Sequence, residues 1–206
     1  MANELERIQH ECVQILRTSA RFFTLVMEWV EFPENVIAPM LRGQVTMDEF
    51  DHIQAVKKLI ETVRTKGEIT LYRGLHGNFA THILASARAG YSFDRATIQS
   101  FTSDRATAIG FTSEEIGCCL LKIAIPVGTP IFYISAYDIV AGREPAEEEY
   151  VLPPGRIVFT GVAKERISTN MKIAGIEFIT PEDDTEEMTV IEGTFLATEW
   201  PPLILV

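Results

Sequence analysis

Residues 147–155 read Glu-Glu-Glu-Tyr-Val-Leu-Pro-Pro-Gly, so three carboxylates lead directly into a short apolar run and a proline turn. Apolar and aromatic residues of this kind favour a buried strand, and the prolines and glycine end it. Successive side chains of a strand point to opposite faces, so Glu147 and Glu149 share one face and Glu148 lies on the other. The segment therefore predicts a strand that presents two neighbouring carboxylates.

The sequence around this strand divides into a helical first third and a strand-rich remainder. Helical spacing of apolar residues or capping patterns predict helices over 4–30, 35–41, 46–65 and 78–89. Short β-rich runs predict strands over 69–72, 118–126, 131–135, 150–152, 156–162, 168–179 and 188–198. Strands that follow helices, rather than alternating with them, favour an α+β fold with an antiparallel or mixed sheet. We expect a helical segment, 1–66, packed on a core formed by 67–206.

Composition places the chain among ordered globular proteins. It has 206 residues, of which 47% are hydrophobic and 23% charged, enough for one domain with a helical extension. The formal net charge is -11, and residues 173–206 contain no Lys or Arg. This charge argues against nucleic acid as a partner, since binding to its backbone depends on Lys and Arg, but it leaves a local basic groove open.

The cysteines and the first residues bear on the compartment. The three cysteines are odd in number and two are adjacent, Cys118 and Cys119, which gives no disulfide framework and indicates a reducing compartment. The chain begins without a basic leader, and its early apolar run, 22–30, is short and contains Glu28. We expect a cytoplasmic protein with no membrane segment, and secretion that uses no cleaved signal stays open as an alternative. The histidines lack metal-ligand spacing, so we expect no metal ion.

Two further motifs precede the acidic strand. Leu71-Tyr72-Arg73-Gly74 places an arginine at the end of a β segment, and Ser100-Phe101-Thr102-Ser103 lies about thirty residues later. Taken singly, each has an ordinary structural interpretation: a surface arginine, a polar loop and a solvated acidic turn. Their order and spacing give them more weight together.

In this order the three motifs resemble the Arg–Ser–Glu class of ADP-ribosyltransferases. That class has an arginine at the end of its first core strand, a Ser-Thr-Ser motif, and Glu/Gln-x-Glu entering an apolar strand. The resemblance covers about residues 69–159. The size and helical leader look like the phage Alt/Mod group, and the motif spacing resembles the enzymatic subunits of binary toxins. It implies an ADP-ribosyltransferase-like split β-sandwich as catalytic core, preceded by a helical segment.

The middle motif departs from the pattern of that class. Counting back from Phe111, which resembles the aromatic residue that follows the motif, puts Ser100 first and Thr102 last. The alternative register starts at Thr102 and uses Ser103. We prefer the first register, and both remain open at this point.

The resemblance implies roles for the residues at the sugar and at the phosphates of NAD. Glu149 would stabilise the oxocarbenium-like cation that forms as nicotinamide leaves, as carboxylates do in glycoside cleavage. Ser100 would orient Glu149. Arg73 would hold the pyrophosphate, and Gly74 would let the backbone approach the nicotinamide amide.

Tyr72, Thr102 and Phe111 complete the implied NAD-binding set. Phe111 would stack near nicotinamide, with a core aromatic as the alternative interpretation. Other arginines that could meet phosphate, Arg95 and Arg105, are expected to be surface residues.

Glu147 determines the acceptor that the resemblance implies. Within that class, glutamate at this position goes with arginine targets, and a carboxylate there can take the proton of the attacking guanidinium. The resemblance thus implies a mono-ADP-ribosyltransferase with NAD as substrate, no metal, and a target protein with an accessible arginine as partner. In a phage or effector protein the compartment would be the host cytoplasm. Residues 138–146 resemble the substrate-recognition loop.

Three alternatives use the same residues. The chain could be an NAD glycohydrolase, with water as acceptor, or a transferase that modifies a nucleic acid. It could also be a non-catalytic binding module with this fold, although such a module has no chemical reason to keep Arg73, Glu147 and Glu149 together.

Overall fold

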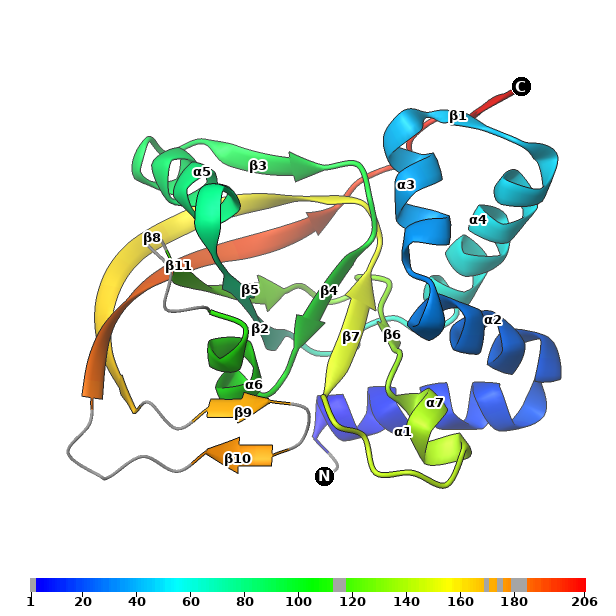
Figure 1. Cartoon of the computed structure of the whole chain (residues 1–206), viewed down its shortest axis with the longest axis horizontal. Helices are drawn as coiled ribbons and strands as arrows, with labels where there is room; N and C mark the ends of the chain where they lie inside the picture. Colours follow the sequence, from blue (N-terminus) through cyan, green and yellow to red (C-terminus); the bar gives the residue numbers. More distant parts are fainter. Residues whose placement is uncertain (1–2, 113–117, 169–170, 174–175, 179–184) are drawn as a thin grey trace.

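A computed structural model describes residues 3–112, 118–168, 171–173, 176–178 and 185–206 (Figure 1). The helices are α1 (Glu4–Thr18), α2 (Ala20–Glu31), α3 (Glu34–Arg42), α4 (Met47–Ile60), α5 (Gly77–Arg88), α6 (Arg105–Gly110) and α7 (Ala136–Val140). The strands are β1 (Gln44–Val45), β2 (Ile69–Leu75), β3 (Ser92–Arg95), β4 (Gln99–Thr102), β5 (Cys119–Ile125), β6 (Phe132–Tyr133), β7 (Glu149–Leu152), β8 (Gly155–Ser168), β9 (Met171–Ile173), β10 (Ile176–Phe178), β11 (Thr185–Ala197) and β12 (Ile204–Leu205).

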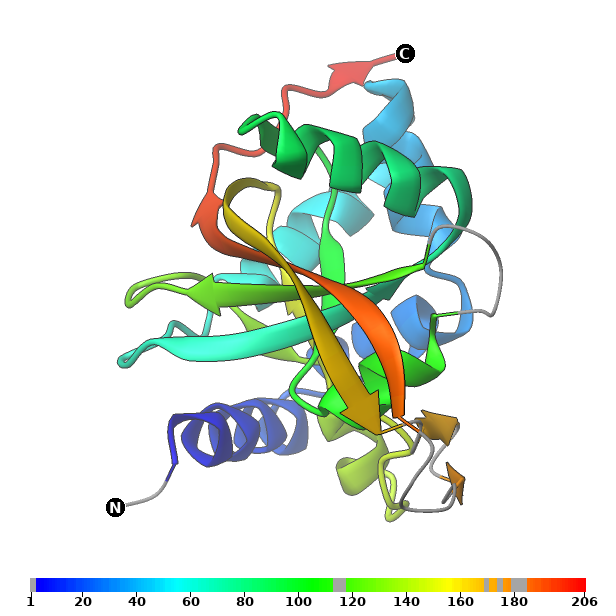
Figure 2. The ribbon, with the colours of Figure 1, turned by 90° about the vertical axis from the view of Figure 1, so that its left-hand side faces the viewer.

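The main sheet has the strand order β3-β8-β11-β5-β2-β4-β7-β6. Its neighbouring strands run antiparallel, except that β11 and β5 pair in parallel. The prediction of an α+β fold with a mixed sheet is therefore confirmed. Figure 2 shows how strongly the long strands β8 and β11 twist, as a right-handed strand twist requires over this length.

The sheet divides into two halves between β2 and β4. β2 pairs with β5 along its whole length, from Ile69 to Leu75, and β4 pairs with β7 through each of its residues. Between β2 and β4, however, only Tyr72 and Thr102 are partners. The half formed by β3, β8, β11, β5 and β2 therefore diverges from the half formed by β4, β7 and β6.

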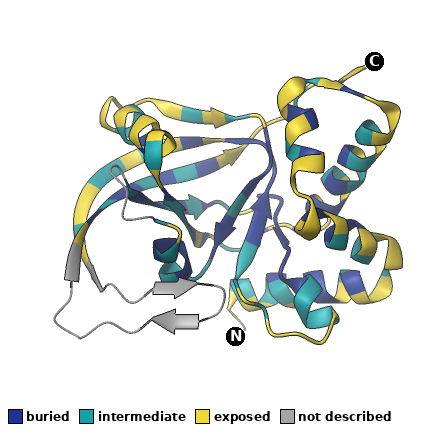
Figure 3. Cartoon of the chain, viewed as in Figure 1, coloured by how far each residue is buried: buried dark blue, intermediate teal, exposed yellow. Residues whose placement is uncertain are grey.

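The N-terminal helices share their core with the sheet. One cluster of buried apolar side chains continues from Ile8 and Cys12 of α1 through Ile53 of α4 to Leu71 of β2 and Tyr150 of β7. Figure 3 shows this buried zone running through the middle of the molecule, with exposed residues on the outer faces of the helices. Among the described helices, none has the length and hydrophobicity to cross a bilayer.

Two helix predictions are wrong in their extent. The helix expected over 4–30 is two helices, because the backbone of Ser19 is extended and interrupts it. The Ser19 hydroxyl accepts from the amide of Phe22 and so caps the start of α2. The helix expected to reach 65 ends at Ile60. The next residues pair with the turn after β5 instead, and the amide of Thr65 donates to Thr129 O at 3.0 Å.

Two strands of the main sheet were not predicted from the sequence. Residues 99–102 form β4, where the ordinary interpretation of the serine motif was a polar loop, and residues 92–95, for which no element was predicted, form β3. Their pairing partners, β8 and β7, are about 50 to 60 residues away in sequence, so tertiary contacts override the local composition. The strand expected over 168–179 lies partly outside the described residues, which place β9 and β10 there.

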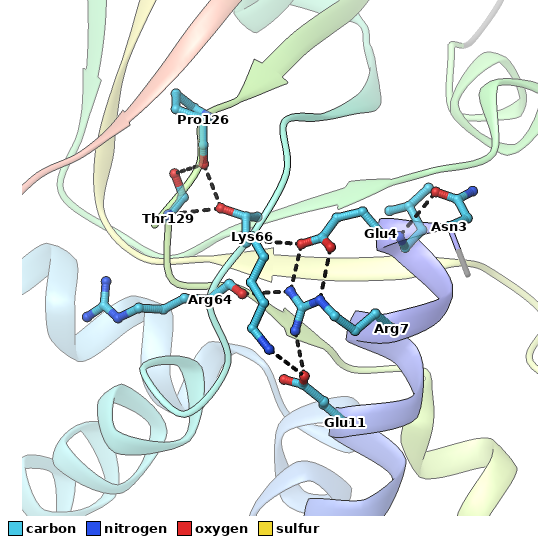
Figure 4. Close-up of polar contacts among 10 residues, drawn as sticks. Asn3, Glu4, Arg7, Glu11, Arg64, Lys66, Pro126 and Thr129 are labelled. Atoms are coloured by element: carbon cyan, nitrogen blue, oxygen red, sulfur yellow. Dashed lines mark hydrogen bonds and ion pairs between the residues drawn. The ribbon is translucent and has the colours of Figure 1, made fainter. Parts of the chain in front are cut away.

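A charged network fixes α1 to the segment that leads into β2 (Figure 4). The guanidinium of Arg7 donates to both carboxylate oxygens of Glu4, at 2.9 and 2.6 Å, and to Glu11 at 2.6 Å. It also donates to the carbonyl of Arg64 at 2.7 Å, while the amide of Lys66 donates to Glu4 at 2.6 Å. The hydrogen bond from Arg7 lowers the pKa of Glu4 to about 2.

We expect Glu4→Gln to lower Tm at pH 7 by about 2–4 °C, which corresponds to about 1 kcal/mol in a chain of this size. Because the pKa of Glu4 is lower in the folded state, its contribution is full above about pH 4.5 and is lost as the pH falls toward 2. The Tm difference from wild type, measured by calorimetry, should shrink over that window. Glu68→Gln, at an exposed position, is the control. A difference that stays constant down to pH 2.5 would contradict this role.

Candidate active site

A cavity of about 250 Å³ opens where the two halves of the sheet separate. Its lining consists of Tyr72, Arg73, Gly74, His76, Ser100, Phe101, Thr102, Ala108, Phe111, Glu147 and Glu149. The residues to which the resemblance gives a catalytic or NAD-binding role with Ser100 as the first motif position are all in this set, although they span almost eighty positions of sequence. Ser103, the alternative position, is not. His76, Phe101 and Ala108 were not nominated. Within the described ranges, no three His, Cys, Asp or Glu side chains gather as a metal site.

Glu149 lies beside Thr102 and close to Ser100 on the facing strand. Thr102 is its direct partner in the β4–β7 register, and Ser100, two residues along, has its side chain on the same face. The Ser100 hydroxyl hydrogen-bonds the Glu149 carboxylate. Burial raises the pKa of Glu149, while this hydrogen bond and the charge of Arg73 act in the opposite direction.

The geometry supports the register that begins at Ser100. The Ser103 hydroxyl hydrogen-bonds the hydroxyl of Tyr150, which is fully buried behind the strand, and Ser103 does not line the cavity. Of the two serines, Ser100 lines the cavity together with Glu149.

Glu147 lines the same cavity and is half-buried. Burial, and then the neighbouring charge of Glu149, raise its pKa, so the proton affinity of this carboxylate is above the ordinary value. Glu148 lies on the opposite side of the strand, against α1, as the alternation of a strand predicts.

Ser135 holds the backbone of both cavity-lining glutamates. Its buried hydroxyl donates to the carbonyl of Glu147 at 2.7 Å and accepts from the amide of Glu149 at 3.0 Å. No sequence signal marked Ser135, because it lies in an ordinary apolar run and meets the glutamates only through the β6–β7 pairing.

Arg73 reaches the gap between the two halves. Its Nη1 donates to the carbonyl of Ser100 at 3.1 Å, and its guanidinium lies over the ring of Phe101 at 5.9 Å. In the part of the chain that the structure describes, no carboxylate lies within ion-pair distance of Arg73. Burial and then the nearby Arg95 lower the pKa of Arg73 to about 10, so it stays cationic at neutral pH. Such a cation suits an anionic ligand.

The two other arginines differ from each other. Arg95 was expected at the surface, but it is half-buried, lies over the ring of Phe79 at 5.2 Å and adds a second positive charge near Arg73. The short strand β3 carries it inward, which no local sequence feature indicated. Arg105 is partly exposed, as expected, and pairs with Glu165 at 2.6 Å.

Gly74 is required by packing against α6. A Cβ at this position would lie 2.1 Å from the carbonyl oxygen of Ala108 and 3.0 Å from Cβ of Phe111. The group that lies close to the backbone of Gly74 is therefore α6 of the protein itself, whereas the resemblance implied a ligand there. It also places Phe111 at the cavity, 51% exposed, so this ring is not a core aromatic.

The expected substrate-recognition loop directly precedes Glu147. Residues 138–146 begin within α7, and Arg143 folds back to pair with Asp138 at 2.8 Å and to lie over the ring of Tyr137 at 5.1 Å.

Comparison with known proteins identifies the fold. No family model and no curated protein matches the sequence. C3stau2 from S. aureus, solved with NAD, superposes with a TM-score of 0.67 at 12% identity over 95% of both chains. Plx2a, an ADP-ribosyltransferase toxin from Paenibacillus larvae, gives 0.65 at 12% identity over 94% of this chain and 95% of that one.

The chain has the ADP-ribosyltransferase fold. The enzymatic component C2-I of the C2-toxin from Clostridium botulinum also shares it, with a TM-score of 0.63 at 10% identity over 86% of this chain and 43% of that one. The predicted fold class is confirmed. The resemblance to the phage Alt/Mod group stays a prediction.

We expect Gly74→Ala to destabilise the protein by about 1–3 kcal/mol, because the added methyl would meet backbone atoms of α6 that cannot rotate away. The displacement of α6 would also move Phe111. Gly161→Ala is the matched control, since the nearest atom to its added Cβ is the end of the Glu192 side chain at 3.8 Å. Urea unfolding of both variants measures the difference, and equal stability of the two would contradict the packing role of Gly74.

Proposed function

We propose that this protein is a mono-ADP-ribosyltransferase that moves ADP-ribose from NAD to arginine side chains of a target protein and releases nicotinamide. The observation that carries the proposal is the convergence of Arg73, Ser100, Glu147 and Glu149 on one cavity of an ADP-ribosyltransferase fold. The solved structure of C3stau2 with NAD supports NAD as the substrate.

The arrangement divides the reaction between the two halves of the sheet. Arg73, which forms no ion pair with a described carboxylate and donates to the carbonyl of Ser100, would hold the pyrophosphate. Glu149, across the gap, would stabilise the positive charge on the ribose as its bond to nicotinamide breaks and nicotinamide leaves with the electron pair. Ser100 would keep the carboxylate turned toward the sugar.

Glu147 supports arginine as the acceptor. A guanidinium becomes nucleophilic only when it loses a proton, so a base must lie next to the ribose. Glu147 projects into the cavity from the same strand face as Glu149, and its raised pKa makes it a better base than an exposed carboxylate. The guanidinium nitrogen would form the new bond to the ribose carbon and give its proton to Glu147.

We expect Glu149→Gln to abolish both protein labelling and nicotinamide release, and Glu147→Gln to abolish labelling while NAD hydrolysis continues. The first change removes the charge that stabilises the cation, and the second removes only the base that the acceptor needs. Labelled NAD incubated with a bacterial lysate, with nicotinamide measured in parallel, separates the two. Glu144→Gln, exposed and close in sequence, is the control.

Each other outcome excludes a specific part of the proposal. Labelling that survives both substitutions would exclude this site. Nicotinamide release from wild type without a labelled protein would favour hydrolysis, and no release at all would favour a binding module. Label that an arginine-specific ADP-ribose hydrolase does not remove would exclude arginine as the acceptor.

A pH profile tests the contact between Ser100 and Glu149. The Ser100 hydroxyl lowers the pKa of Glu149, so Ser100→Ala should raise that pKa and shift the acidic limb of the kcat/KM profile for NAD cleavage to higher pH. Ser103→Ala removes a hydroxyl that bonds Tyr150 instead and should leave the limb in place. A shift in the Ser103 variant alone would support the alternative register.

A further inference from the structure

Helix α1 contacts both halves of the sheet from outside it. Its first turns are bonded to the segment that leads into β2, and its middle turns lie against β6 and α7 of the other half (Figures 1 and 4). Since β2 and β4 share only the pair Tyr72–Thr102, few hydrogen bonds within the sheet fix how far its halves separate. A rigid element bonded to both halves would fix the distance between them.

Gln9 makes the bond to the acidic strand. Its Nε2 donates to Oε2 of Glu148 at 2.5 Å and to the hydroxyl of Tyr150 at 3.0 Å. A side-chain amide nitrogen carries two hydrogens, and here one goes to each neighbour of Glu149. The backbone of Glu148 is held as well, because its carbonyl accepts from the amide of Ser103 at 3.3 Å.

The first turns of α1 are bonded to the half that carries Arg73. Arg7 and Glu4 bond the backbone of Arg64 and Lys66, just before β2. This segment is fixed in turn to the end of β5, because the hydroxyl of Thr65 donates to the carbonyl of Pro126 at 2.6 Å. The helix therefore connects the β2–β5 pair to the strand of Glu149.

We propose that α1 sets the spacing between Arg73 and the glutamates, and that Gln9 is the positioning residue through which it acts on Glu147 and Glu149. The inference rests on the proposed function for its effect on turnover, but the geometric part does not depend on activity. Gln9 acts through Glu148 and Tyr150, which point away from the cavity, so it touches no reacting atom.

The kinetic consequence follows from where Gln9 acts. Small displacements of a reacting group lower the rate strongly. The binding of NAD should change less, because the cation that would hold its pyrophosphate lies on the other half. We expect Gln9→Ala to lower kcat for nicotinamide release about tenfold and to change KM for NAD by less than about twofold. Gln14→Ala, the same change at an exposed position of the same helix, should match wild type.

A donor–acceptor exchange separates positioning from loss of packing. Gln9→Glu places a carboxylate against Glu148 and should lower kcat at least as much as Gln9→Ala. Adding Glu148→Gln to that variant restores a donor and an acceptor in reversed order and should recover most of kcat. No recovery in the double variant, or equal kcat in the Gln9→Ala and Gln14→Ala variants, would overturn the proposal.

A distance measurement tests the spacing whether or not the protein turns over NAD. Spin labels at Thr70→Cys on β2 and Ala146→Cys beside Glu147, both exposed, report the separation of the halves, with Cys118→Ser in the background. We expect Gln9→Ala to broaden the distance distribution and Gln14→Ala to leave it unchanged. Unchanged distributions in both would overturn the spacing role, whereas inactivity of wild type alone would overturn only the proposed function.

Discussion

A single residue pair, Tyr72 with Thr102, joins the two halves of the main sheet, and the candidate site exists because the strands separate beyond it. A continuous ladder of hydrogen bonds between β2 and β4 would have left no space between the two halves. The gap instead exposes strand faces from both halves to one cavity, so that groups from β2 and from β7 meet across it. Gly74 and α6 limit the cavity on one side, since the helix packs too close for any side chain at that glycine.

The separated halves differ in the charge that they bring to the cavity. Arg73 is a partly buried cation without a described carboxylate partner, close to a second cation, Arg95. Across the gap, Glu147 and Glu149 are carboxylates whose burial raises their pKa values. Keeping like charges together in each half is unfavourable. Under the proposed function, an anionic pyrophosphate would relieve the arginines, and a developing cation would relieve the carboxylates.

The buried core supports this arrangement from behind. The helices that precede the sheet contribute to the same apolar cluster as β2 and β7, so they are part of the support of the site. Polar contacts also fix the position of the three glutamates that precede β7 or begin it. Ser135 fixes the backbone of both cavity glutamates, and Gln9 holds Glu148 from the other face.

The sequence by itself determined the α+β class and the opposite orientation of Glu148, because these depend on local period and residue type. The order of three motifs, and their resemblance to a known class, also pointed to most of the residues that line the cavity. The tertiary structure decided the rest. β3 and β4 became strands through distant partners, Gly74 proved necessary for α6, and Ser135 and Gln9 reached the acidic strand from remote positions. Such contacts depend on which segments pack together, and that information is distributed over the whole chain and not carried by any one motif.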